Sequence, residues 1–189
     1  MDRAELISLL ADYPVILAIK NEEGLQRCLE SENPLVFVLR ATLTNVSSIV
    51  DTLKTHGKTV FVHMDLIDGL SQREEAVEYL AKNTGVDGII STKPNLVRHA
   101  ASLGLLTVQR YFLLDSKSLQ TVVKAGSQEV ADLVEVLPGL MPKIIRQLSS
   151  TFRVPLVAGG LISDKEDVIA ALSAGASAIS TTSEDVWFL

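Results

Sequence analysis

Two apolar segments near the end of the chain each finish in residues that suit the binding of an anion. The first ends in Gly159 and Gly160, and a backbone without side chains can approach a ligand closely. The second ends in the hydroxyl residues 180–183, which lead into a short helical segment. Backbone amides at the start of a helix attract anions, and hydroxyl groups add hydrogen-bond donors. We therefore predict that Gly159, Gly160, Thr181 and Thr182 bind a phosphate monoester.

A purely structural explanation of these residues stays open. Gly159 and Gly160 would then form only a tight turn, and Ser183 would be only a helix cap. One such loop is weak evidence for a ligand. Two loops at the ends of successive apolar segments favour the phosphate site.

Four charged residues follow other apolar segments of the chain. They are Lys20, Asp65, Arg110 and Glu135. A lysine or arginine would complement the charge of a phosphate, and a carboxylate would accept hydrogen bonds from ligand hydroxyl groups. Each residue alone is equally consistent with a solvated charge or a surface ion pair. Their membership of one site depends on a fold that brings these segment ends together.

The elements that position these residues repeat along the chain. Eight short apolar segments, rich in β-branched residues, are typical of parallel strands that are buried on both faces. Segments of helical periodicity separate them. The eight apolar segments begin near Pro14, Leu35, Thr59, Val86, Leu105, Leu133, Pro155 and Ser177.

This alternation predicts an α/β fold, a compact (β/α)8 barrel of the TIM type. Residues 1–189 would form a single barrel domain, and residues 1–12 a short helix that covers the bottom of the barrel. In such barrels the functional face lies at the C-terminal ends of the strands, and phosphate groups often bind after the last two strands. An open, doubly wound sheet of the flavodoxin type is the alternative.

Two helix starts are marked by a serine and a glutamate at the spacing of a capping box. Ser71 with Glu74, and Ser163 with Glu166, have this spacing. We expect each serine to cap its helix.

Composition and charge exclude several classes of protein. The 189-residue chain has 47% hydrophobic and 21% charged residues, as globular proteins do. Its formal net charge of −6 argues against a broad, non-specific nucleic-acid surface but leaves room for a small, local RNA site. The single cysteine, Cys28, excludes an internal disulfide, and no apolar segment approaches the length of a membrane span. We expect a cytoplasmic protein without a signal peptide, metal ion or cofactor.

Five motifs along the chain are specific in combination. They are, in order, FVHMDLIDGL, DGIISTKPNLVRHA, TVQRYFLLDSKSL, VEVLPGLMP and VAGGLISDKEDVIAALSAGASAISTTSEDVW. From about Pro14 to Trp187 the chain resembles the glycerol uptake operon antiterminator regulatory protein family. The resemblance implies a small barrel that responds to glycerol 3-phosphate. It also implies action on the leader mRNA of glycerol-utilisation genes, where the protein lets transcription pass a terminator.

Under this resemblance the predicted residues divide between two parts of one ligand. The glycines and threonines of the last two loops would bind the phosphate of glycerol 3-phosphate. Lys20, Asp65, Arg110 and Glu135 would surround its hydroxyl groups and balance its charge. The protein would then be a regulator that senses this ligand, with no catalytic residue.

Support for RNA binding in the sequence itself is limited. The nearest groups of basic residues are Lys93, Arg98 and His99, and Lys143, Arg146 and Arg153. Both groups are expected on outer helices, where exposed charges are ordinary. A homodimer could assemble a basic surface that one chain lacks.

The alternative function is that of a barrel enzyme, an isomerase, aldolase or lyase, acting on a small phosphate ester. Asp65 or Glu135 would then act as a general base, and Lys93 as an amine that forms a Schiff base. Against this, Lys93 precedes Pro94 in an expected loop.

Overall fold

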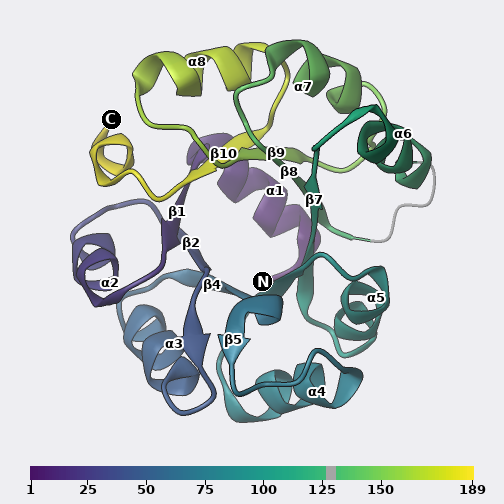
Figure 1. Ribbon diagram of the computed structural model, residues 1–189. Coiled ribbons are helices and arrows are strands. Elements are labelled where there is room, and N and C mark those ends of the chain that lie inside the picture. The colour runs from purple at the N-terminus through teal and green to yellow at the C-terminus, as the bar shows by residue number, and fades with distance from the viewer. Residues whose placement is uncertain (127–130) are drawn as a thin grey trace.

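The structure is a computed structural model that describes residues 1–126 and 131–189. Parallel strands close into a barrel in the order β1-β10-β9-β8-β7-β6-β4-β2 (Figure 1). The closed sheet confirms the predicted (β/α)8 barrel over the open, doubly wound alternative. The barrel strands are β1 (Val15–Ile19), β2 (Leu35–Val38), β4 (Thr59–His63), β6 (Gly88–Ser91), β7 (Leu106–Phe112), β8 (Leu133–Leu137), β9 (Leu156–Gly159) and β10 (Ala178–Thr181).

Helices form a ring outside the barrel and connect successive strands (Figure 1). Among the described residues, two short 3-10 helices are η1 (Met64–Leu66) and η2 (Glu184–Phe188). Strand β10 is followed by η2 rather than by an α-helix. The α-helices of the ring are α2 (Glu22–Leu29), α3 (Val46–Thr55), α4 (Glu74–Asn83), α5 (Pro94–Ser102), α6 (Ser116–Ala125), α7 (Pro142–Ser149) and α8 (Lys165–Ser173).

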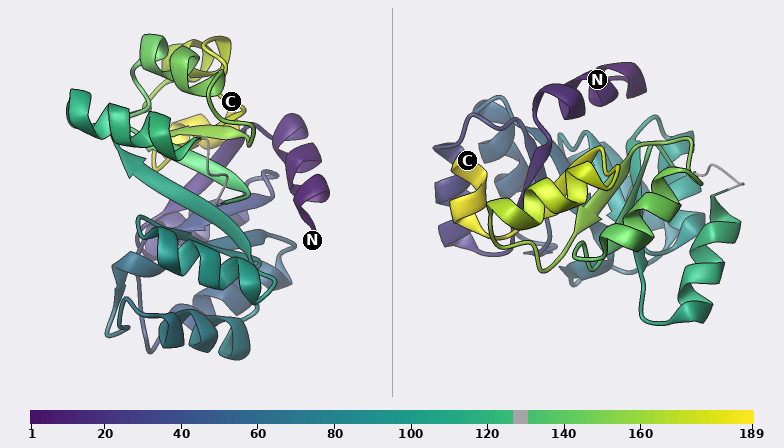
Figure 2. Two further views of the ribbon diagram at one scale, coloured as in Figure 1. Left: turned by 90° about the vertical axis from the view of Figure 1, so that its right-hand side faces the viewer. Right: turned by 90° about the horizontal axis from the view of Figure 1, so that it is seen from above.

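Helix α1 (Arg3–Asp12) closes the N-terminal end of the barrel, as predicted for residues 1–12. Its Leu6 and Leu10 are fully buried and pack with inward-facing strand residues such as Phe37 and Phe61. Figure 2 (right) shows α1 across one end of the barrel, and α6 projecting at the opposite end. Among the described residues, α1 thus covers the N-terminal end of the barrel, and the C-terminal ends of the strands are left open.

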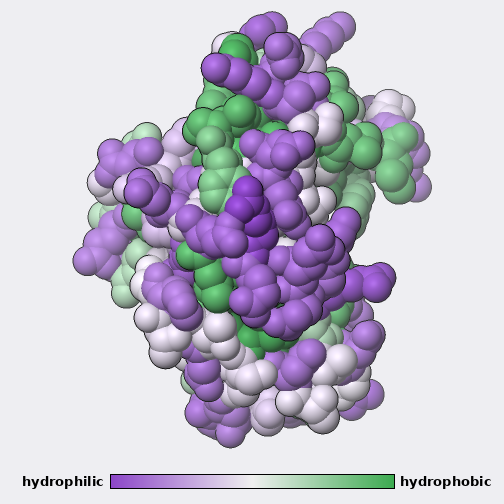
Figure 3. Space-filling view, turned by 90° about the vertical axis from the view of Figure 1, so that its left-hand side faces the viewer, coloured by the Kyte–Doolittle hydropathy of each residue, from purple (hydrophilic) through white to green (hydrophobic). Residues whose placement is uncertain are grey.

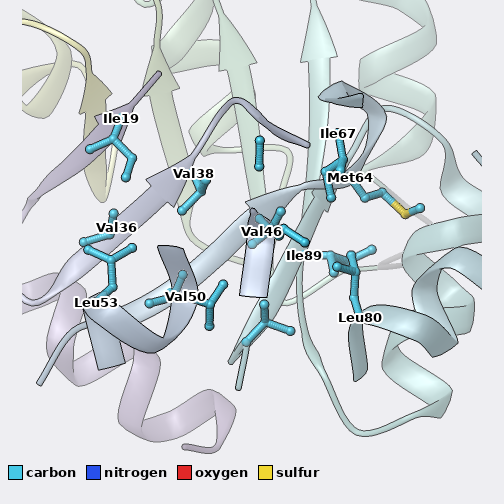
Figure 4. Close-up of a cluster of buried hydrophobic side chains, with 14 of the residues drawn as sticks. Ile19, Val36, Val38, Val46, Val50, Leu53, Met64, Ile67, Leu80 and Ile89 are labelled. Carbon is cyan, nitrogen blue, oxygen red and sulfur yellow. The ribbon is translucent and has the colours of Figure 1, made fainter. Parts of the chain in front are cut away.

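Apolar side chains also fill the space between the strands and the ring of helices. Figure 4 shows part of this packing, in which Val36 and Ile89 of the strands lie near Val50, Leu53 and Leu80 of the helices. Burying one such side chain stabilises the fold by about 1.5–3 kcal/mol. Because both faces of each strand are covered, the strand segments are apolar without alternation, and this made them recognisable in the sequence.

The two predicted serine caps are wrong by one or two residues. Helix α4 begins after Arg73, with no side-chain cap, so Ser71 lies outside it. Helix α8 is capped by Asp164, whose carboxylate accepts a hydrogen bond from the N–H of Asp167. Ser163 instead donates its N–H and hydroxyl to the Asp167 side chain. An aspartate one position later takes the cap because its carboxylate is an equally good acceptor.

A second, two-stranded sheet lies beside the open end and was not predicted. Its parallel strands are β3 (Ala41–Thr42) and β5 (Ile67–Asp68), which follow β2 and β4. Strands of two residues have no periodicity that sequence reading can detect.

No helix of residues 1–126 and 131–189 is long and apolar enough to cross a membrane. The side of the molecule that carries α2, α3 and η2 is mostly hydrophilic, with hydrophobic residues exposed among the hydrophilic ones (Figure 3).

Candidate functional site

A cavity of about 420 Å³ opens at the C-terminal ends of the strands, on the side of β7 to β10. The loops after β9 and β10 form one wall, and strand residues of β7 and β8 form the opposite one. Predicted site residues contribute much of this lining. They are Arg110, Glu135, Gly160, Thr181 and Thr182.

A buried ion pair lies at the base of this cavity. Arg110 on β7 and Glu135 on β8 are paired in register, and Nε of Arg110 donates to Oε2 of Glu135 at 2.5 Å. Ser180 on β10 donates its hydroxyl to the other carboxylate oxygen, Oε1, also at 2.5 Å. Glu135 is fully buried and Arg110 nearly so. Neither terminal nitrogen of Arg110 makes a hydrogen bond to a described residue, so the guanidinium has free donors on the cavity wall.

Gly159 lies beneath this network rather than on the cavity wall. A Cβ atom at this position would be 2.5 Å from Oε1 of Glu135 and 2.6 Å from the hydroxyl oxygen of Ser180. Glycine is therefore needed here because the Glu135 carboxylate and the Ser180 hydroxyl occupy the space of a side chain.

Gly160 begins a turn of unusual backbone conformation. It has φ of +75°, which glycine adopts readily, and the next residue, Leu161, has φ of +64° although it carries a side chain. Both residues line the cavity. Non-glycine residues in the left-handed region cost free energy and cluster at functional sites.

The two predicted threonines have different positions. The Thr181 hydroxyl is buried, donates to the carbonyl of Ile162 at 2.6 Å and accepts from the N–H of Ser183 at 2.9 Å. It therefore joins the two loops and is already satisfied. Thr182 is exposed and lines the cavity, so it is the threonine placed to contact a ligand.

Lys20 lies in a neighbouring hollow of about 400 Å³, after β1. This hollow shares Ala18 and Thr182 with the cavity of Arg110. Lys20 is exposed and forms no ion pair with a described carboxylate, so it adds positive charge at the rim.

Asp65 is not on the cavity wall. It lies in η1, directly after β4, and its carboxylate accepts hydrogen bonds from the Ser91 hydroxyl and from both the N–H and the hydroxyl of Thr92. Burial by itself raises the pKa of Asp65, but these hydrogen bonds lower it further than burial raises it, so the pKa lies below its usual value. Asp65 is thus an ionised group that fastens the loop after β4 to the loop after β6.

His63 is buried, with 3% of its surface exposed, and feels the charges of both Asp65 and Arg110. Burial and the positive charge of Arg110 lower the pKa of His63 to about 4, although Asp65 opposes them. Its Nδ1 atom has no hydrogen-bond partner among the described residues. The imidazole is therefore neutral at pH 7.

Sequence reasoning left His63 and Ser180 out of the predicted site. Strand periodicity would have found them, since every second residue of a strand points into the barrel. Phe61 and Ala178 lie in the inner cluster, so His63 and Ser180, two residues further on, also face inward. The same rule separates Ser180 from Thr181, which faces the other way.

The sequence of this chain matches one family over nearly all of its length. The family described as "Glycerol-3-phosphate responsive antiterminator" matches residues 15–187. The "Uncharacterized protein YgcP" of Escherichia coli (strain K12) is 40% identical over 184 residues, which cover 97% of this chain and 96% of that protein.

Two similar crystal structures have related descriptions. The glycerol uptake operon antiterminator regulatory protein from Listeria monocytogenes has a TM-score of 0.87 at 29% identity, over 92% of this chain and 94% of that one. A glycerol uptake operon antiterminator-related protein from Thermotoga maritima has a TM-score of 0.80 at 34% identity, over 93% of this chain and 98% of that one.

Structures at much lower identity include enzymes. The deoxyribose phosphate aldolase from Aeropyrum pernix has a TM-score of 0.67 at 16% identity, over 98% of this chain and 96% of that one. This likeness shows the barrel fold alone.

Proposed function

Because the chain belongs to the glycerol-3-phosphate responsive antiterminator family, we propose that it binds glycerol 3-phosphate and thereby controls antitermination on a leader mRNA. The cavity of about 420 Å³ is the proposed site. The observation that carries this assignment is the buried guanidinium of Arg110, which faces the hydroxyl-rich loops after β9 and β10 from the cavity wall.

The phosphate group is proposed to bind between Arg110 and the two loops. The free terminal nitrogens of Arg110 suit a phosphate because a guanidinium can donate two parallel hydrogen bonds. Gly160 lets the backbone approach closely, and the exposed Thr182 adds a hydroxyl donor. Lys20 would contribute charge from the neighbouring hollow.

Glu135 is proposed to position Arg110. Its carboxylate holds Nε of Arg110 on one oxygen and the Ser180 hydroxyl on the other, which fixes the guanidinium in the orientation that meets the ligand. Removing one partner of a buried charge pair costs about 3–5 kcal/mol, so this geometry is strongly held.

The positions of the candidate catalytic groups support binding without turnover. Glu135 is neutralised by Arg110, and Asp65 is held by three hydrogen bonds outside the cavity. Lys93 is the residue before α5 and does not line the cavity. We therefore propose a regulator rather than an isomerase, aldolase or lyase.

The ligand is tested by calorimetric titration with glycerol 3-phosphate, with glycerol and inorganic phosphate as controls and a check for product afterwards. Arg110→Gln should reduce the affinity at least tenfold, whereas Arg98→Gln on the exposed side of α5 should not. Because Arg110→Gln leaves Glu135 buried and unpaired, the exposed Thr182→Trp provides a second variant that fills the cavity. Equal affinities in all proteins would place the ligand elsewhere, and product formation would identify an enzyme.

Action on RNA is tested by in vitro transcription of a leader template with its terminator. Read-through should increase when protein and glycerol 3-phosphate are both present. A cytoplasmic homodimer is proposed for the functional state, and sedimentation velocity measures its subunit number.

A further inference from the structure

The net charge of −6 is very unevenly distributed along the chain. Residues 88–163 contain eight lysines and arginines but only four aspartates and glutamates, a net charge of +4. The remaining residues contain nine basic and nineteen acidic residues, a net charge of −10. Residues 88–163 include strands β6 to β9, which are neighbours in the barrel. One side of the molecule is therefore basic, and the rest is acidic.

The outer helices of this basic side contain no acidic residue. Their sequences are PNLVRHAAS in α5, SKSLQTVVKA in α6 and PKIIRQLS in α7. Figure 1 shows the three as successive helices of the ring, and Figure 2 (left) shows the side that carries α5 and α6. We call the basic face the surface that carries Arg98, Lys117, Lys143 and Arg146.

The cations of the basic face are available to a partner. All four are exposed, and none forms an ion pair with a carboxylate of the described residues. Three acidic residues in the described part of residues 88–163 are engaged elsewhere. Asp115 caps α6, Asp132 accepts hydrogen bonds from Thr107, and Glu135 is buried against Arg110.

An apolar hollow of about 350 Å³ adjoins the basic face, between the end of β7 and α6. Tyr111, Phe112 and Leu114 line it together with Lys117 and with Asp115, whose carboxylate caps α6. Phe112 is 50% exposed and Leu114 is 84% exposed, which is unusual for large apolar side chains. An exposed aromatic ring beside a free lysine is the combination that binds an unpaired nucleic-acid base.

We propose that single-stranded RNA binds the basic face, with one base stacked on Phe112 in this hollow. The proposal rests on the proposed function and assigns the RNA site that it leaves open. Lysines and arginines neutralise phosphates and supply affinity, whereas an aromatic ring stacks on any base. The acidic remainder of the molecule repels RNA, so the strand is confined to this side.

The position of Phe112 also connects the RNA site with the ligand cavity. Arg110 and Phe112 are two residues apart on β7, and both are paired with β8 in register. A ligand that fixes Arg110 therefore acts on the strand end that carries the stacking ring. Coupling between two binding sites is reciprocal. If glycerol 3-phosphate raises the affinity for RNA by some factor, RNA should raise the affinity for glycerol 3-phosphate by the same factor.

The proposal is tested by fluorescence anisotropy with a labelled leader RNA of the organism's glycerol-utilisation genes. Phe112→Ala should weaken RNA binding about tenfold, and Lys117→Ala and Arg146→Ala should each reduce the slope of log K against log salt by about 1. Phe188→Ala and Lys165→Ala are matched controls, because these exposed residues lie on η2 and α8, outside the basic face. All these variants should keep the wild-type affinity for glycerol 3-phosphate.

Three results are distinguishable. Loss of RNA affinity confined to the basic-face variants supports the proposal. Tight RNA binding by the wild type with equal affinity in the Phe112, Lys117 and Arg146 variants overturns the proposal and leaves the proposed function standing. No RNA binding by the wild type, with or without glycerol 3-phosphate, overturns both the proposal and the RNA part of the proposed function.

Discussion

Glu135 and Ser180 occupy space that a side chain at position 159 would fill. This arrangement determines how the ligand cavity is built, because the carboxylate of Glu135 holds Arg110 on one side and Ser180 on the other. Arg110, Glu135 and Ser180 lie on β7, β8 and β10. Strand β9 lies between β8 and β10, and its Gly159 leaves room for the Glu135 and Ser180 side chains. At the scale of single residues, the site therefore depends both on the Arg110–Glu135 ion pair and on the absence of a side chain at position 159.

Substituting Gly159 tests this packing directly. Gly159→Ala should lower the free energy of unfolding by about 3 kcal/mol, since the new methyl group displaces Glu135 from a buried ion pair. Urea denaturation measures the loss. Gly85→Ala is the control, because its nearest atom would be Cγ of Lys54 at 3.7 Å, an ordinary contact. Losses of similar size in both variants would contradict the role of Gly159.

His63 makes stability depend on pH. Its pKa is about 4 in the fold, whereas an unfolded histidine has a pKa of about 6.5, so between these values the unfolded chain binds a proton that the fold excludes. Stability should therefore fall as the pH is lowered from about 6.5 to 4, by ~1.4 kcal/mol per unit and ~3 kcal/mol in total. Asp65, whose pKa is lowered, titrates below this window.

Urea denaturation between pH 7 and 4.5 checks the contribution of His63. His63→Gln should flatten the decline of stability with falling pH, and His56→Gln, at an exposed position, should keep the wild-type slope. An unchanged slope in His63→Gln would show that other groups cause the decline.

Residue types alone predicted which strand ends carry polar groups but not which side chains meet. Arg110 and Glu135 were predicted, and the register of β7 and β8 brings them together. Asp65 was also predicted to belong to the site, yet three hydrogen bonds from Ser91 and Thr92 hold it outside the cavity. The difference depends on where each strand ends relative to its neighbours, and this stagger is a property of the closed barrel.

Helix α1 is the element that closes the barrel, and its two faces give a matched test. Leu10→Ala should lower the free energy of unfolding by about 2–5 kcal/mol, because Leu10 is buried in the barrel interior. Ile7→Ala on the same helix should cost less than about 1 kcal/mol, because Ile7 is 41% exposed. Thermal denaturation compares the two. Equal losses of unfolding free energy would show that α1 stabilises the protein through helix formation rather than through burial of Leu10 in the barrel.

The number and order of the elements followed from the sequence, but their ends did not. The barrel strands were predicted because both faces are buried and largely apolar, as in β2. The cap of α8 was misplaced because Ser163 and Asp164 are both good cap residues and spacing does not choose between them. Strands β3 and β5 were missed because two residues form no pattern.

Net charge describes the whole molecule poorly when charges are segregated. A total of −6 argued against a nucleic-acid surface, yet the fold gathers residues 88–163, with a charge of +4, on one side. Basic residues that are scattered in the sequence become neighbours because α5, α6 and α7 follow one another around the ring. At moderate salt, charges are screened beyond about 10 Å. A partner therefore interacts with the charge of the side that it approaches and not with the net charge of the whole protein.

This segregation predicts binding to heparin despite a sequence pI of about 5.1. At low ionic strength, about 20 mM salt, the protein should be retained on a heparin column and elute as the salt is raised. A variant with Lys117, Lys143 and Arg146 all changed to Ala should pass through, whereas Lys165→Ala should be retained. Passage of the wild-type protein at low salt would contradict a basic face.

The glycine at position 159 also restricts how this protein can diverge. Any larger residue there requires a smaller residue at position 135 or 180, and a smaller residue at position 135 leaves Arg110 without its counter-charge. Single changes at positions 135 and 159 are therefore costly, whereas combined changes can restore both the packing and the charge balance. The three strand ends should evolve as one unit, and a lineage that lost the glutamate would be free to lose the glycine and the arginine with it.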